Sequence, residues 1–183
     1  MKRLLSIFAF FIAIQGACAQ SVYVMGIRVD QPFGNFANAV APKLISTTRN
    51  DNYAIEGNCN FAGFNDCCFF AHTFSSGCGN YLAVVSIGIK TSTPEKTLQD
   101  IISSIQKKYS KSFQKRHLYD CTDGNLDKLG IIGHSNTCIT GDQYVSQKIG
   151  SVTIICSANY YNGYSVWLYY YVDCRQSIDS SDL

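Results

Sequence analysis

The residue types able to act as nucleophile or base in this chain are histidine, serine and cysteine, and they form no complete catalytic motif. Gly133-His134-Ser135-Asn136-Thr137 has the serine of a nucleophile elbow but lacks the closing glycine. A hydrolase would use Ser135, or a cysteine that stays reduced, with a histidine as its base. The sequence has no phosphate loop, dinucleotide fingerprint or metalloprotease helix. We therefore expect a non-enzymatic protein that needs no cofactor, keep a secreted hydrolase as the alternative, and leave the catalytic residues unassigned.

Cysteine is the most unusual of these residue types, and its number indicates disulfide bonds. Of the nine cysteines, Cys18 lies in the leader segment described below, and eight remain. An even number in an exported chain predicts disulfides, because compartments outside the cytosol keep thiols oxidised. The sequence leaves open how these eight residues pair: Cys59, Cys67, Cys68, Cys78, Cys121, Cys138, Cys156 and Cys174.

A zinc site is the alternative for the first group of cysteines. Cys59, Cys67, Cys68, His72 and Cys78 lie within twenty residues, and thiolate with imidazole is a ligand set that zinc prefers. However, the spacing is not a paired C-x2-C form, and thiolates survive poorly in an oxidising compartment. We therefore favour disulfides and expect no metal. In a strand, the vicinal cysteines 67 and 68 would point to opposite faces and need different partners.

Aromatic residues crowd the end of the chain and provide the best candidate binding surface. On a strand, Trp167, Tyr169 and Tyr171 share one face, while aliphatic residues dominate the other. Such a stripe is either a second buried face, which stiffens the sheet by cross-strand packing, or an exposed platform. Exposed tryptophan and tyrosine are used to recognise sugars and proteins. We therefore take these three residues as the candidate site for a protein or glycan partner.

The N-terminus has the pattern of a cleavable signal peptide over residues 1–19. Lys2 and Arg3 precede an apolar run, and Ala17-Cys18-Ala19 supplies the small side chains that a signal peptidase reads. Lipidation of Cys18 is the less favoured alternative. The apolar run is shorter than the about 20 residues that span a bilayer, and no later stretch approaches that length. We expect a secreted or periplasmic protein with no membrane span after cleavage.

The mature chain then reads as one domain over residues 20–176, followed by a short polar tail at 177–183. Cleavage reduces the 15 basic side chains to 13, which equals the number of acidic ones. A nucleic-acid-binding protein would normally show a clear basic excess. We therefore expect no nucleic-acid partner.

The pattern of apolar residues predicts an α+β domain. Strands are expected at 22–28, 53–64, 68–74, 81–89, 149–158 and 164–174, and loops at 46–52 and 118–142, with one strand near 129–132. Helical spacing predicts a helix over 33–41, ended by Pro42, and one of about four turns that begins after Thr93. Asn162-Gly163 predicts a two-residue hairpin turn that places Cys156 opposite Tyr169. We expect antiparallel sheet covered by about two helices and stabilised by disulfides. The order of strands and helices along the chain also allows two halves, each made of a helix and strands.

Several short motifs resemble a group of small, mostly uncharacterised exported proteins that is common in Bacteroidetes. The motifs are Met25-Gly26-Ile27, Asn60-Phe61-Ala62-Gly63-Phe64, Ile89-Lys90-Thr91 before the long helix, Gly150-Ser151-Val152-Thr153-Ile154 and Tyr171-Val172-Asp173. The helix-plus-strands halves are also loosely similar in fold to tandem-repeat protein inhibitors of β-lactamase. These resemblances imply an exported α+β fold, and neither supplies a catalytic residue.

Overall fold

An eight-stranded antiparallel sheet forms the centre of the molecule. The structure is a computed structural model, and it describes residues 20–73, 80–118 and 141–173. The spatial order is β3 (Ser46–Asn50), β4 (Ala54–Phe61), β5 (Phe64–His72), β6 (Val84–Ile89), β10 (Val166–Val172), β9 (Val152–Ser157), β8 (Gly141–Ser146) and β7 (Phe113–Leu118). The helices are α2 (Phe33–Val40) and α3 (Pro94–Tyr109), with a short 3-10 turn η1 (Ala41–Lys43). The expected α+β class, with antiparallel sheet and two helices, is confirmed.

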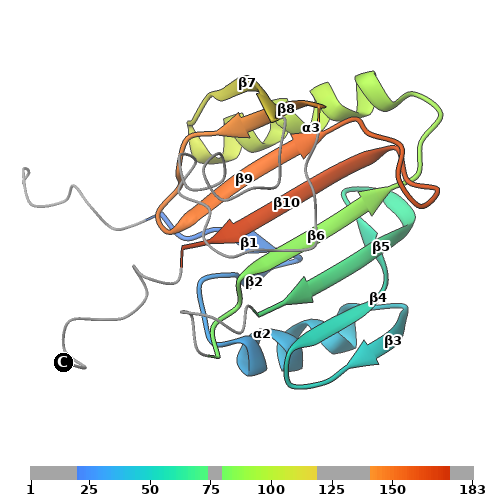
Figure 1. Cartoon of the computed structure of the whole chain (residues 1–183), viewed down its shortest axis with the longest axis vertical. Coiled ribbons are helices and arrows are strands. Elements are labelled where there is room, and N and C mark those ends of the chain that lie inside the picture. Colours follow the sequence, from blue (N-terminus) through green and yellow to red (C-terminus); the bar gives the residue numbers. More distant parts are fainter. Residues whose placement is uncertain (1–19, 74–79, 119–140, 174–183) are drawn as a thin grey trace, which may run out of the picture.

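The sheet divides into two halves, each made of one helix followed by a four-stranded meander. Helix α2 precedes the meander β3–β6, and helix α3 precedes the meander β7–β10. The last strands of the two meanders pair antiparallel, with Val85 opposite Tyr170, and so join the halves into one sheet. Figure 1 shows α2 beside the first half and α3 behind the second.

The two faces of this sheet differ in what they bury. The face that we call the helix face packs against α2 and α3, and it includes Val85, Ile87, Leu168 and Tyr170. The opposite face, which we call the aromatic face, carries a smaller cluster of buried residues: Ala83, Val84, Val145, Ile155, Trp167, Tyr169 and Tyr171. Alternation along each strand separates the two sets, because successive side chains point to opposite sides.

Both helices form where the sequence predicts them. In α2, Phe33, Phe36 and Val40 are buried on one side, and Pro42 lies in the 3-10 turn that follows. Helix α3 begins with Pro94 at its first position, where the fixed proline φ suits a helix and no hydrogen bond is lost. Thr93 occupies the N-cap position, but its side chain makes no capping hydrogen bond. Among the described residues, no helix is long and apolar enough to cross a membrane.

Two segments differ from the sequence predictions. Residues 22–28 do not form one strand but a small hairpin, β1 (Tyr23–Val24) and β2 (Ile27–Arg28). The turn reverses at Met25 and Gly26, whose φ angles are 52° and 79°, as a two-residue hairpin turn requires. Residues 46–50, expected as a loop, are the edge strand β3, and all five side chains are exposed. A strand with no buried side chain has no apolar alternation to reveal it. The expected strand near 129–132 lies outside the described residues.

The turn of the closing hairpin is confirmed, but its register is not. Tyr161 pairs with Tyr164 around Asn162-Gly163, whose φ angles are 50° and 82°. Further from the turn, Cys156 lies opposite Leu168 rather than Tyr169. The β9 side therefore contains one more residue than the β10 side, which is the arrangement of a β-bulge. This slip moves Cys156 to the helix face, and its expected sharing of a face with Trp167 is wrong.

Candidate functional site

A cleft opens between helix α3 and the sheet, beside the turns of the β1–β2 and β4–β5 hairpins. It has a volume of about 460 Å³. Its walls are the β1–β2 turn, the β4–β5 turn and one side of α3, and its floor is the helix face of β10. The apolar part of this lining comprises Met25, Phe61, Phe64, Ile101, Ile105 and Leu168.

Two tight turns with left-handed backbone shape one side of the cleft. The β1–β2 turn is Met25-Gly26, and the β4–β5 turn is Ala62-Gly63, with φ angles of 51° and 85°. Positive φ at both central residues lets each hairpin reverse within two residues. The neighbouring side chains of Phe61 and Phe64 therefore stay at the end of the sheet, facing α3, instead of being carried away by a longer loop.

The buried polar residues that line the cleft are Tyr109 and Tyr170, together with Thr97. The hydroxyl of Tyr109 accepts a hydrogen bond of 3.2 Å from the backbone N–H of Tyr23. Burial raises the pKa of Tyr170, with nearby Cys156 and Tyr109 adding to the effect. The Tyr170 hydroxyl therefore stays protonated and serves as a hydrogen-bond group rather than as a base.

Among the described residues, the charged side chains that line the cleft are Asp100 and Lys108, both exposed on α3 at its mouth. Asp100 is bonded to Lys96 at 2.6 Å, one turn away on the same helix. Lys108 lies over the ring of Tyr109, with its Nζ 5.0 Å from the ring centroid. Because the charge of Asp100 is balanced by Lys96, Lys108 gives this rim a positive character. The arrangement suits an apolar body inside the cleft and an anionic group at its mouth.

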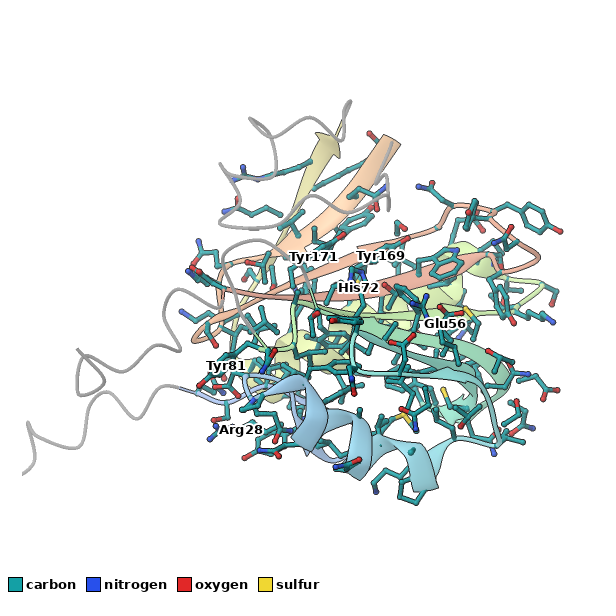
Figure 2. All side chains as sticks on the ribbon, turned by 60° about the horizontal axis from the view of Figure 1, so that its bottom comes forward. Arg28, Glu56, His72, Tyr81, Tyr169 and Tyr171 are labelled. Carbon is teal, nitrogen blue, oxygen red and sulfur yellow. The ribbon has the colours of Figure 1, made fainter. Side chains whose placement is uncertain are left out.

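The predicted aromatic site is a packed ladder of rings. Trp167, Tyr169 and Tyr171 share one face as expected, with ring centroids 6.0 and 6.1 Å apart in stacked geometry. Their side chains are only 7%, 8% and 2% exposed. Figure 2 shows Tyr169 and Tyr171 on the side of the sheet away from α2. The structure thus makes these three residues a second buried face and not an exposed platform.

The exposed end of the ladder lies at the β9–β10 turn. Tyr161 is 63% exposed, and its ring centroid is 5.9 Å from that of Trp167. Tyr160, beside it, is 81% exposed. Within the described part of the chain, this tip is the portion of the aromatic stripe that is open to a partner.

The structure shows no disulfide among the four described cysteines, which are distributed over both faces of the sheet. Cys59 and Cys67 lie directly opposite each other on the helix face, and Cys68 lies on the aromatic face. The expected opposite orientation of Cys67 and Cys68 is confirmed. The disulfide stabilisation expected from the sequence has no support among these residues, and Cys78, Cys121, Cys138 and Cys174 lie outside the described part. Within the described ranges, no three metal-binding side chains converge, because strand pairing separates Cys59 and Cys67 from Cys68 and His72.

These thiols are not activated as nucleophiles. Burial raises the pKa of Cys59 to about 12 and that of Cys68 to about 11, and it also raises the pKa of Cys67 and Cys156. A catalytic cysteine needs a lowered pKa, because the thiolate is the attacking species. The other predicted nucleophile, Ser135, lies outside the described residues, as does His134.

His72 should make stability depend on pH near neutrality. Burial lowers the pKa of His72 below its ordinary 6.5, although the adjacent Thr73 carbonyl, 3.0 Å from Nδ1, opposes the shift. As the pH falls below about 6.5, the unfolded chain takes up a proton before the folded one does, so folding stability decreases. We expect the loss of stability between pH 7.5 and 5.5, measured by urea unfolding, to be smaller in His72→Gln than in the wild type. The difference should be below about 1.4 kcal/mol, the value of one pKa unit. Equal pH dependence in both proteins would contradict this role of His72.

Comparison with protein-family models, curated proteins and solved structures gives no match to this chain.

Proposed function

We propose that this protein is an exported, non-enzymatic binding module whose cleft between α3 and the sheet takes a small apolar ligand with an anionic group. The single observation that carries the proposal is the cleft itself. Its volume of about 460 Å³ lies within the range of roughly 300–1,000 Å³ found for small-molecule sites. Such sites are mostly apolar and contain a few placed polar groups, which here are the hydroxyls of Tyr109 and Tyr170.

The apolar lining supplies the affinity in this proposal. Ile101 and Leu168 are buried, and Ile105 is half-buried on the cleft side of α3. A ligand that covers such surface gains about 25 cal/mol for each Å² of apolar area removed from water. The hydroxyls and the rim charge then orient the ligand, since a polar end placed among the aliphatic side chains would lose its hydration without compensation.

The rim supports an anionic end rather than a cationic one. Lys108 lies at the mouth of the cleft, and Asp100 is already paired with Lys96. A carboxylate or sulfonate on the ligand would gain from Lys108, whereas an ammonium group would meet a like charge. An exposed pair of this kind is worth at most about 1 kcal/mol, so the charge selects among ligands more than it binds them.

Export and a disulfide framework belong to the same proposal. The leader pattern over residues 1–19 and the even number of remaining cysteines support export of the protein from the cytosol. A non-enzymatic role is supported by the raised pKa values of the described thiols and of Tyr170, which keep these groups protonated near neutral pH. A secreted hydrolase based on Ser135 remains the alternative.

A second candidate function is recognition of a protein or glycan by the tip of the β9–β10 hairpin. Tyr160 and Tyr161 are the observation that favours it, because they are well exposed and Tyr161 packs on the buried ladder at Trp167. A rigid, exposed tyrosine loses little conformational entropy when a partner covers it.

Filling the cleft tests the first proposal. Ser104 is exposed on α3 and lines the cleft, so Ser104→Trp should occupy the space of the ligand. We expect at least a tenfold loss of affinity for anilinonaphthalene sulfonate, an apolar fluorophore with an anionic group, measured by fluorescence titration. The thermal midpoint should change little, because the new ring enters space that is open in the wild type.

Ser103→Trp is the matched control, since Ser103 is exposed on the same helix but does not line the cleft. It should bind the probe as the wild type does. Phenylnaphthylamine, which lacks the anionic group, should lose affinity in Ser104→Trp but be insensitive to Lys108→Gln. Unchanged probe binding in Ser104→Trp would overturn the assignment of the cleft, while a partner that binds at Tyr160 and Tyr161 would be unaffected by it.

A further inference from the structure

We infer that Cys59 and Cys67 form a cross-strand disulfide that locks the β4–β5 hairpin, the wall of the cleft. The two residues are direct partners in the antiparallel pairing of β4 with β5. Both side chains are fully buried, and they belong to the same core cluster on the helix face. Two thiols so placed face each other across neighbouring strands.

The backbone geometry of this pair suits a disulfide. Directly opposite residues of an antiparallel pair have Cα atoms about 4.5 to 5.5 Å apart, and disulfides join Cα atoms about 4.4 to 6.8 Å apart. In the structure the Cys67 thiol contacts the carbonyl oxygen of Phe64 on its own strand at 3.6 Å, and formation of the bond would replace this contact. The neighbouring Cys67 also contributes to the raised pKa of Cys59, as expected for thiols in close proximity.

The other described cysteines are badly placed as partners for Cys59. Cys68 is next to Cys67 in sequence, but it faces Gly88 and Tyr164 on the aromatic face. Cys156 is on the helix face of β9, four strands away in the order of the sheet. At about 4.8 Å for each strand spacing, that is about 19 Å, beyond the about 7 Å limit for a disulfide.

The bond forms by thiol–disulfide exchange with an oxidant that carries a disulfide, such as oxidised glutathione or an oxidoreductase. One thiolate attacks a sulfur of the oxidant and forms a mixed disulfide, releasing one thiol. The second cysteine then attacks its partner's sulfur in that mixed disulfide. The products are the Cys59–Cys67 bond and the oxidant in its dithiol form, so two electrons and two protons pass to the oxidant. Burial raises the pKa of Cys59 to about 12, so the reaction belongs to the folding chain, before the core closes.

The consequence for the cleft follows from what the hairpin contains. Phe61 and Phe64 lie between the two cysteines and line the cleft, and the turn Ala62-Gly63 joins them. A covalent link at the base of the hairpin holds both rings against α3. Loss of the link would leave this wall to main-chain hydrogen bonds and to the packing of the two rings against the core. This consequence rests on the proposed function, whereas the bond itself does not.

Peptide mapping tests the bond directly. The chain is reduced in denaturant, refolded in a mixture of oxidised and reduced glutathione, and its remaining thiols are blocked with N-ethylmaleimide. Cleavage before Asp66 separates Cys59 from Cys67, and cleavage after Phe69 separates Cys67 from Cys78. Mass spectrometry should find the Cys59 fragment linked to the fragment that contains Cys67 and Cys68, and the link should disappear on reduction.

Two serine variants identify the sulfur involved. Cys68→Ser should keep the link to Cys59, whereas Cys67→Ser should lose it and leave Cys59 blocked by the reagent. If Cys67→Ser does not fold, wild type and Cys68→Ser decide the question alone. Blocked Cys59 in the refolded wild type, or Cys59 linked to any other cysteine, would overturn the assignment. Loss of probe binding with the link intact would count against the cleft and not against the bond.

Discussion

Replacing Gly57 with alanine should lower the free energy of unfolding by about 1–3 kcal/mol, the usual range for overpacking. A Cβ atom at this position would lie 1.9 Å from the backbone carbonyl oxygen of Ser46 and 3.1 Å from the Cα of Thr47. These are main-chain atoms of β3, so no side-chain rotation relieves the contact. Because β3 is an edge strand with exposed side chains, we expect it to be displaced from β4. Urea unfolding followed by the fluorescence of Trp167, the only tryptophan, measures the change.

Hydrogen exchange gives a second and more local test of the same contact. Amide protection should be lost in β3 and retained in β6 and β10, which lie further inside the sheet. Gly34→Ala is the matched control, because its added Cβ would meet nothing within 4 Å and the residue is exposed in α2. That variant should be as stable as the wild type or up to about 1 kcal/mol more stable, since alanine favours helix. If Gly57→Ala behaved like Gly34→Ala, the close approach of β3 to β4 would be wrong.

The sequence predicted those parts of the fold in which local signals and burial agree. In α3, proline and glutamate stand at the start, and apolar residues such as Leu98 and Ile102 recur at helical spacing and are buried. The β6 segment alternates between Val85 and Ile87 on the helix face and Ser86 and Gly88 on the other. In each of these segments the regularly spaced apolar side chains pack against the core. Their periodicity was therefore enough to predict the position of the helix and of the strand.

The segments that were missed have no such pattern. All five residues of β3 are exposed, so its strand character comes only from hydrogen bonding to β4. Met25 adopts a φ of 52°, which is unusual for a residue other than glycine, asparagine or aspartate. The sequence therefore contains no signal that would divide residues 22–28 into a hairpin. The slip that moved Cys156 to the helix face depends on one extra residue near the β9–β10 turn, and only the three-dimensional register reveals it.

The cleft was beyond sequence analysis for a different reason. Its walls come from β1–β2, β4–β5, α3 and β10, segments that lie far apart along the chain. Each segment contributes apolar residues that look like ordinary core. Met25-Gly26 and Ala62-Gly63 were noted as short motifs, but their meaning as turns at the edge of a cavity depends on the way the sheet brings them to α3. The shared face of Trp167, Tyr169 and Tyr171 was predictable from alternation, whereas its burial depends on what packs over it.

Trp167→Ala should be the most destabilising of the single substitutions considered, with a loss of about 3–5 kcal/mol. The indole ring is 5.7 Å from the Tyr164 ring and 6.0 Å from that of Tyr169, measured between centroids. Gly88 lies opposite and leaves room for it: a Cβ there would be 3.0 Å from the indole. Removing the ring therefore opens a cavity in the middle of the ladder. Urea unfolding followed by circular dichroism measures the effect, since the variant has no tryptophan.

Two further variants separate a packing role from a binding role. Trp167→Phe keeps a ring at this position, and it gives up an indole Nε1 that has no hydrogen-bond partner among the described residues, so it should cost much less than alanine. Tyr160→Ala removes an exposed ring of the same hairpin and should change stability by less than about 0.5 kcal/mol. A residue kept for an exposed partner would behave in the opposite way, losing binding on truncation while the fold kept its stability. If Trp167→Ala unfolded at the same urea concentration as the wild type, the ladder would not be part of the core, and the aromatic face would return as the leading binding surface.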